Sequence, residues 1–89
     1  MIVGVIGGLG PAATIDFMGR VLRATPAARD QEHLHLLVDN DPTVPDRNAA
    51  MRGDGPSPGP HLAGMAKRLE AAGANFLVMP CNMAHCWAA

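Results

Sequence analysis

The sequence predicts an α/β fold with three layers, in which helices cover both faces of a parallel β-sheet. Three short apolar runs of strand length alternate along the chain with two segments whose apolar residues recur at helical spacing. Strands and helices that alternate in this way pair their strands in parallel through right-handed crossovers. The expected order is therefore βαβαβ, followed by the start of a third helix.

The first expected unit is a strand followed by a helix. Residues 2–6 (IVGVI) form a β-branched run that ends in glycines, which is consistent with a buried parallel strand. Pro11 suits the first turn of the following helix, where its missing N–H group costs nothing. The pair Thr25-Pro26 ends this helix, because the residue before a proline avoids the helical conformation. The apolar stripe of the helix consists of Ile15, Met18, Val21 and Leu22.

The second and third strands frame a long connection and a second helix. Residues 33–38 (HLHLLV) are the second strand, which stops at the polar residues 39–42. The connection from 39 to 60 is longer than usual, so we expect it to be functional or mobile. The next helix closes at Gly73, its expected C-cap. Its apolar stripe consists of Leu62, Met65, Ala66 and Leu69. Residues 76–79 form the third strand, which residues 80–82 break.

Size and topology together predict an incomplete domain. At 89 residues the chain holds at most one small domain. Three parallel strands with unpaired edges make a poor free-standing sheet. We therefore expect residues 1–89 to be an N-terminal α/β domain cut from a longer protein.

Composition argues against several classes of partner. The net charge of −1 and the scattered Lys and Arg leave no basic stripe for nucleic acid. Phe17, Phe76 and Trp87 are too few aromatic residues for a base-stacking platform. The apolar stretch at 2–6 is too short for a signal or membrane segment. We expect a cytoplasmic protein whose two cysteines are reduced thiols.

Ligands of such folds bind where the parallel strands end. Three segments reach that edge, at 7–11, 39–47 and 80–85, and the third contains Cys81. Backbone N–H groups and the helix dipole favour an anion in a strand-to-helix turn, and so favour a thiolate there. Such a thiolate could act as a nucleophile, a metal ligand or a base that removes a proton from carbon. The alternative is that Cys81 is simply a small buried apolar side chain.

Neighbouring residues offer further candidates. Arg47, in the long connection, is suited to hold a carboxylate through two hydrogen bonds. Asn82 can donate and accept beside the thiol, or cap the following helix. His85 could pair with the thiol, cap the helix or pack in the core, and Cys86 is expected to pack in the core. No fourth ligand joins Cys81, His85 and Cys86 at zinc-like spacing, so we expect no metal.

A glycine pattern follows the first strand and suggests a second class of ligand. Read from Gly8, it spells the G-x-G-x-x-A fingerprint of dinucleotide-binding folds. Asp39, at the end of the second strand, could then contact a ribose. However, Pro11 removes one of the N–H groups that would face a pyrophosphate. A nucleotide-binding module therefore stays as an alternative.

Three linked motifs carry a family resemblance. They are "GVIGGLGPAAT", "RDQEHLHLLVDNDPTVPDR" and "GANFLVMPCNMAH". In this order and spacing they resemble the N-terminal half of the aspartate racemase branch of the Asp/Glu racemase superfamily, from about residue 1 to 85. The resemblance implies a cofactor-independent racemase of aspartate or glutamate with two similar α/β halves. A cysteine from each half faces the substrate Cα from opposite sides.

The resemblance also assigns roles to individual residues. Cys81 matches the first catalytic cysteine, Asn82 a neighbour that holds the substrate carboxylate, and Arg47 an arginine associated with recognition of that carboxylate. Leu9 replaces a methionine common in a loop that lines the site. Met83 replaces a threonine, which removes a hydroxyl group and places a bulkier thioether beside the substrate carboxylate.

One thiol limits what this chain is expected to do. Cys86 is too near to Cys81 in sequence to reach the opposite face of the substrate, so the 89 residues alone are expected not to racemise. A longer form is expected to be a homodimer that acts on a small amino acid, without nucleic acid or membrane partners. A single-cysteine decarboxylase relative and an inactive remnant stay open as alternatives.

Overall fold

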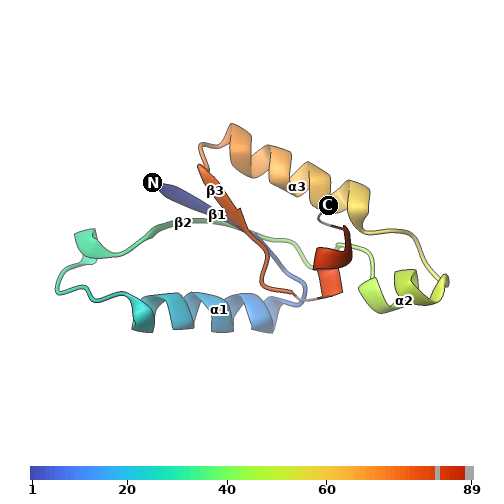
Figure 1. Ribbon diagram of the computed structural model, residues 1–89, viewed down its shortest axis with the longest axis horizontal. Coiled ribbons are helices and arrows are strands. Elements are labelled where there is room, and N and C mark those ends of the chain that lie inside the picture. The colour runs from blue at the N-terminus through green and yellow to red at the C-terminus, as the bar shows by residue number, and fades with distance from the viewer. Residues whose placement is uncertain (82, 88–89) are drawn as a thin grey trace.

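The computed structural model describes residues 1–81 and 83–87. Three parallel strands form one sheet in the order β2-β1-β3, with β1 at Ile2–Gly7, β2 at His35–Asn40 and β3 at Phe76–Val78. The long helices α1 (Pro11–Ala24) and α3 (Gly59–Ala71) lie on opposite sides of this sheet (Figure 1). The predicted α/β fold with a parallel sheet between helices is confirmed.

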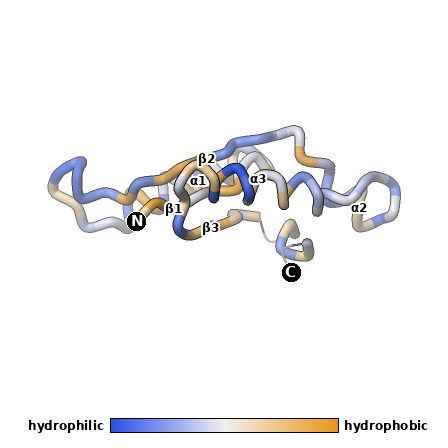
Figure 2. The backbone as a smooth tube through the Cα atoms, turned by 90° about the horizontal axis from the view of Figure 1, so that it is seen from above, coloured by the Kyte–Doolittle hydropathy of each residue, from blue (hydrophilic) through white to orange (hydrophobic). Residues whose placement is uncertain are grey.

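The central strand β1 aligns the carboxyl ends of the three strands at one edge of the sheet. β1 pairs with β2 from Ile2↔His35 to Gly7↔Asn40, and with β3 from Val3↔Phe76 to Val5↔Val78. All its residues after Ile2 are buried, and the strands carry much of the hydrophobic sequence, while the connections at the two ends of the molecule are more hydrophilic (Figure 2). Because the strands are parallel, the segments that follow them emerge at one edge.

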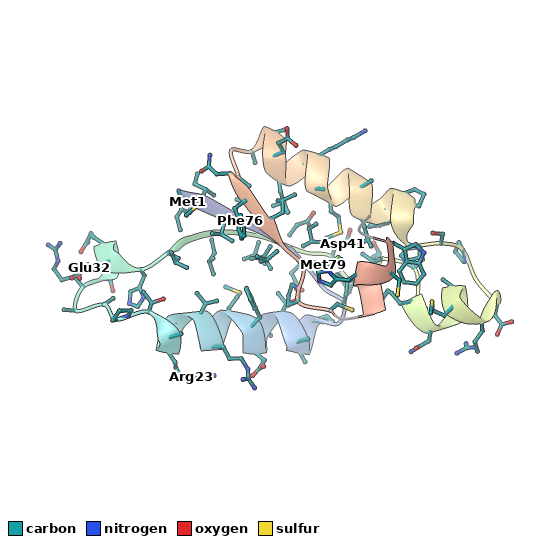
Figure 3. The ribbon with its side chains drawn as sticks, viewed as in Figure 1. Met1, Arg23, Glu32, Asp41, Phe76 and Met79 are labelled. Carbon is teal, nitrogen blue, oxygen red and sulfur yellow. The ribbon has the colours of Figure 1, made fainter. Side chains whose placement is uncertain are left out.

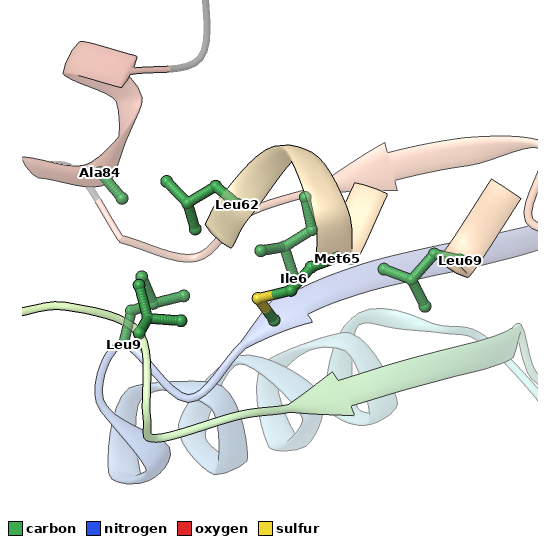
Figure 4. Packing of buried hydrophobic residues seen from close by; sticks show 7 residues of the cluster. Ile6, Leu9, Leu62, Met65, Leu69 and Ala84 are labelled. Atoms are coloured by element: carbon green, nitrogen blue, oxygen red, sulfur yellow. The ribbon is translucent and has the colours of Figure 1, made fainter. Parts of the chain in front are cut away.

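The main hydrophobic core lies between α3 and the sheet. The buried stripe of α3, which is Leu62, Met65 and Leu69, packs toward Ile6 of β1 (Figure 4). Leu9, Val44 and Ala84 extend the same cluster beyond the carboxyl ends of the strands. The predicted apolar stripe of this helix is confirmed, and the core continues into the segments that carry the candidate site.

The other helix differs from expectation. Thr14 is the buried residue of α1, whereas the side chains of the expected stripe remain exposed: Ile15 by 69%, Met18 by 38% and Leu22 by 57%. The sheet has three strands, and its outer strands present partly exposed residues. This surface is too narrow to cover the apolar stripe of a 14-residue helix.

Several boundaries also differ. β2 runs to Asn40 rather than stopping before the polar residues, because β1 extends to Gly7 and pairs with it there. The long connection contains a further helix, α2 (Arg47–Arg52), whose N-cap Asp46 accepts from the amide of Asn48. The expected third helix begins as a short 3₁₀ helix, η2, at Met83–Trp87. In the part of the chain that is described, no helix has both the length and the apolar character needed to cross a membrane.

Candidate active site

The three segments that follow the strands converge as the sequence predicts. Leu9 follows β1, Val44 follows β2 and Ala84 follows β3, and all three are buried in one cluster. Cys81 is half-buried and packs against that cluster. Figure 4 shows Leu9 and Ala84 at the end of the cluster where β1 stops. The thiol therefore lies at the carboxyl edge of the sheet.

The glycine turn is built around Gly8 and Thr14. Gly8 has φ 95°, and a Cβ atom there would collide with the backbone of Asp41. Its amide donates to the hydroxyl oxygen of Thr14, 2.9 Å away, and Thr14 is only 2% exposed. One N–H group of the turn is thus used inside the protein, and Pro11 at the first helical position has none. Both features count against pyrophosphate binding.

Leu9 lies in the core rather than at a surface. Its side chain is 5% exposed and belongs to the cluster that Ile6 and Met65 share. Sequence reasoning placed Leu9 in a loop that lines the site and missed Thr14. The position of Thr14 at the end of the glycine motif is the only signal that the sequence offered.

The turn that carries Cys81 is held by one carbonyl group. The oxygen of Met79 accepts from the amide of Cys81 and contacts Nε2 of His85, each at 2.8 Å. Because a carbonyl oxygen only accepts, Nε2 of His85 is the donor. His85 therefore stabilises the turn that carries Cys81 by a hydrogen bond to the main chain at Met79, not by a contact with the thiol.

Cys86 does not pack in the interior. It is exposed, whereas Ala84 of the same short helix is completely buried and Trp87 packs against the core. The expectation of a buried Cys86 is wrong, because η2 presents other residues to the core. The predicted ligand Asn82 lies outside the described residues. Met83 begins η2, and its predicted role stays a prediction.

Arg47 is the first residue of α2 and is half-buried. Its Nη1 atom donates to the carbonyl oxygens of Val44 and Pro45, at 3.3 Å each. Both contacts use Nη1, which is one of the three nitrogen atoms of the guanidinium group, and a planar fork of five N–H donors is the group that matches a carboxylate. The orientation of Arg47 is thus set by its own connection.

A network of charged side chains joins the start of the connection that follows β2 to α3. Asp41 accepts from the hydroxyl group of Thr43 at 2.6 Å, and its other oxygen is 2.8 Å from Nε2 of His61. Arg68 lies 2.8 Å from Asp39 and 3.9 Å from Asp41. The hydrogen bonds from Thr43 and His61 hold the pKa of Asp41 well below its usual value. Asp41 is therefore ionised, and Nε2 of His61 is the donor.

Sequence reasoning missed this network. Neither His61 nor Asp41 was assigned a role from the sequence. In Figure 3, Asp41 and Met79 lie toward the end of the sheet that faces η2, whereas Met1 lies toward the opposite end. The contact joins residues 20 positions apart, and no short motif encodes it.

An apolar cavity of about 710 Å³ adjoins the turn that carries Cys81, because Met79, Pro80 and His85 are among the residues that line it. β3, α3, η2 and Phe17 of α1 line this cavity, and Cys81, Leu9 and Arg47 do not. Its walls are mostly apolar, which does not suit a charged amino acid. Among residues 1–81 and 83–87, no group of three or more His, Cys, Asp or Glu side chains is placed to hold a metal ion.

Comparison with known proteins places this geometry in a family. The family model described as Asp/Glu/Hydantoin racemase matches residues 6–89. The structure of a Picrophilus torridus aspartate racemase superposes with a TM-score of 0.93 and 40% sequence identity, over 98% of this chain. This chain spans 38% of the length of that racemase. With the family model covering nearly all of its residues, the chain belongs to the Asp/Glu/hydantoin racemase family.

Proposed function

We propose that this chain is part of a cofactor-independent racemase of aspartate or glutamate, in which Cys81 is one of two catalytic thiols. The observation that carries the proposal is the position of Cys81, half-buried at the carboxyl edge of the sheet against the cluster that contains Leu9 and Val44. Membership of the racemase family supports the reaction class. The likeness to an aspartate racemase supports an acidic amino acid as the substrate.

The proposed chemistry is the transfer of one proton on each face of the substrate. The thiolate of Cys81 takes the α-proton and becomes a thiol, while the electron pair of the broken C–H bond spreads into the substrate carboxylate. A second thiol on the opposite face then gives its proton to Cα and becomes a thiolate. Arg47 and Asn82 would hold the substrate carboxylate and stabilise the charge that develops there.

The second thiol is not Cys86 in this proposal. Cys86 follows Cys81 by five residues and is exposed on η2. A side chain on the same short segment cannot reach the opposite face of a substrate that Cys81 contacts. The proposal therefore includes a second half with its own cysteine, a homodimer of that longer form, and a cytoplasmic location that keeps both thiols reduced.

Alkylation of Cys81 tests the proposal directly. A Cys86→Ser variant leaves one thiol, and its reaction with iodoacetamide is followed by mass spectrometry. L-Aspartate or L-glutamate should slow the reaction at Cys81 several-fold, whereas L-lysine and NAD should not. Chiral chromatography should find no D-aspartate after incubation of this chain with L-aspartate.

Two results would count against it. Absence of protection by both acidic amino acids would favour an inactive remnant. Formation of D-aspartate that disappears in Cys81→Ser would show that these 89 residues supply both bases, which contradicts the division of the two thiols between halves.

A further inference from the structure

We propose that His61 is a positioning residue for the substrate site, because its hydrogen bond to Asp41 fixes the connection 41–47 and with it the guanidinium group of Arg47. This inference rests on the proposed function, since it assigns a role in holding the substrate carboxylate. His61 does not need to touch the substrate. It acts through the backbone that carries Arg47.

Asp41 is the point at which the connection is tied to the rest of the fold. Its amide donates to the carbonyl oxygen of Gly7, 3.1 Å away, at the end of β1. Its backbone packs so closely on Gly8 that no side chain would fit there. One carboxylate oxygen accepts from both the amide and the hydroxyl group of Thr43, at 2.9 and 2.6 Å. Asp41 therefore sets both the glycine turn and the first turn of the connection.

His61 anchors Asp41 to a rigid element. It lies in the first turn of α3, next to Leu62, which is 5% exposed in the core. Its Nε2 atom meets the second oxygen of Asp41 at 2.8 Å, and both side chains are mostly covered, with 29% and 20% of their surfaces exposed. A displacement of Asp41 would have to break this contact or move the helix. Movement of the helix is opposed by the packing of α3 in the core.

The path from Asp41 to Arg47 is short and continuous. Val44, three residues after Asp41, is 5% exposed in the core cluster. Its carbonyl oxygen and that of Pro45 accept from Nη1 of Arg47. The carbonyl groups that orient the guanidinium thus belong to the segment that Asp41 and Val44 hold at two points. Loss of the contact at Asp41 would leave this segment with one fewer anchor.

The charges around the pair favour the same arrangement. Arg68, on α3, lies 3.9 Å from the oxygen of Asp41 that His61 contacts, and it also pairs with Asp39 at 2.8 Å. The side chain of Arg68 is 60% exposed, so solvent screens its contribution. The more covered contact from His61 is the one that specifies where the carboxylate lies.

A matched pair of amides tests the inference. In the Cys86→Ser background, His61→Gln places an N–H donor near the position of Nε2, whereas His61→Asn carries the same amide one methylene group shorter. Protection of Cys81 by L-aspartate is measured for both, and circular dichroism checks that both fold. We expect His61→Gln to keep the protecting concentration of L-aspartate and His61→Asn to raise it roughly tenfold, since the hydrogen bond to a charged group is lost.

Each result has one meaning. Equal protection in His61→Asn and His61→Gln would overturn the inference, and so would a loss of folding in His61→Asn alone, because the contact would then be a general stabiliser. If the protein with the native His61 shows no protection, the proposed function fails first. The two failures are therefore distinguishable.

Discussion

Thr14 is a polar side chain in an almost completely buried position, and one buried hydrogen bond accounts for it. Its hydroxyl oxygen accepts from the amide of Gly8, which is buried in the turn between β1 and α1. A buried N–H group without a partner costs free energy comparable to a lost hydrogen bond. The turn therefore depends on Thr14 as much as on its glycines.

This role predicts different outcomes for two small substitutions. Thr14→Val keeps the shape but removes the acceptor, and we expect it to lower the free energy of unfolding by about 1–3 kcal/mol. Thr14→Ser keeps the hydroxyl group. Urea denaturation measures the stability, and hydrogen exchange of the Gly8 amide measures the contact. The amide should exchange fast in Thr14→Val and stay protected in Thr14→Ser; equal protection would contradict this role.

Single residues show how far sequence reasoning reaches. The segments with Leu9, Val44 and Cys81 converge because all three strands run in the same direction, and the alternation of strands and helices in the sequence predicts that direction. The contact between His61 and Asp41 depends on how α3 lies across β2, and no local pattern fixes that. Leu9 was placed in the correct loop, but its burial depends on the packing of neighbouring segments.

At the scale of elements, the two long helices have similar apolar stripes in sequence but differ in how far those stripes are buried. Apolar stripes at helical spacing predict both, and both exist at nearly the expected bounds. The stripe of α3 is buried, whereas much of the stripe of α1 is exposed. A sequence pattern says which face of a helix is apolar, but the area available to cover it is set by the number of strands. α2 was missed because it is short and carries no stripe of its own.

The contrast predicts unequal costs for truncation on the two helices. Met65 is completely buried, so Met65→Ala should lower the free energy of unfolding by about 2–5 kcal/mol through lost burial and a cavity. Ile15 is 69% exposed, and Ile15→Ala should change the free energy of unfolding by no more than about 0.5 kcal/mol. Alanine has a higher helix propensity than either residue, and the gain is larger at Ile15, because a β-branched side chain is less favourable in a helix than methionine. Urea denaturation followed by circular dichroism compares them; a similar loss for both would contradict the unequal packing.

The whole molecule is elongated for its length. Its radius of gyration is 14.0 Å and its extents are 48 × 25 × 20 Å, whereas a compact chain of 89 residues has a radius of about 12 Å. Apolar surface is exposed on α1 at Ile15 and Leu22, and on β3 at Phe76. Exposed apolar side chains that share one face of a helix favour association with another apolar surface.

We therefore expect this chain to associate with itself as its concentration rises. Sedimentation velocity should show species larger than the monomer at about 100 μM, because the stripe of α1 buries apolar surface when two copies meet. Ile15→Lys combined with Leu22→Glu should shift the distribution toward the monomer without a change in net charge. A matched variant, Ala13→Lys with Ala24→Glu, adds the same charges to exposed positions of the same helix and keeps the stripe, so it should associate like the original chain. If the stripe variant associates as strongly as the control, the contact lies elsewhere, and the exposed edge of β3 is the next surface to change.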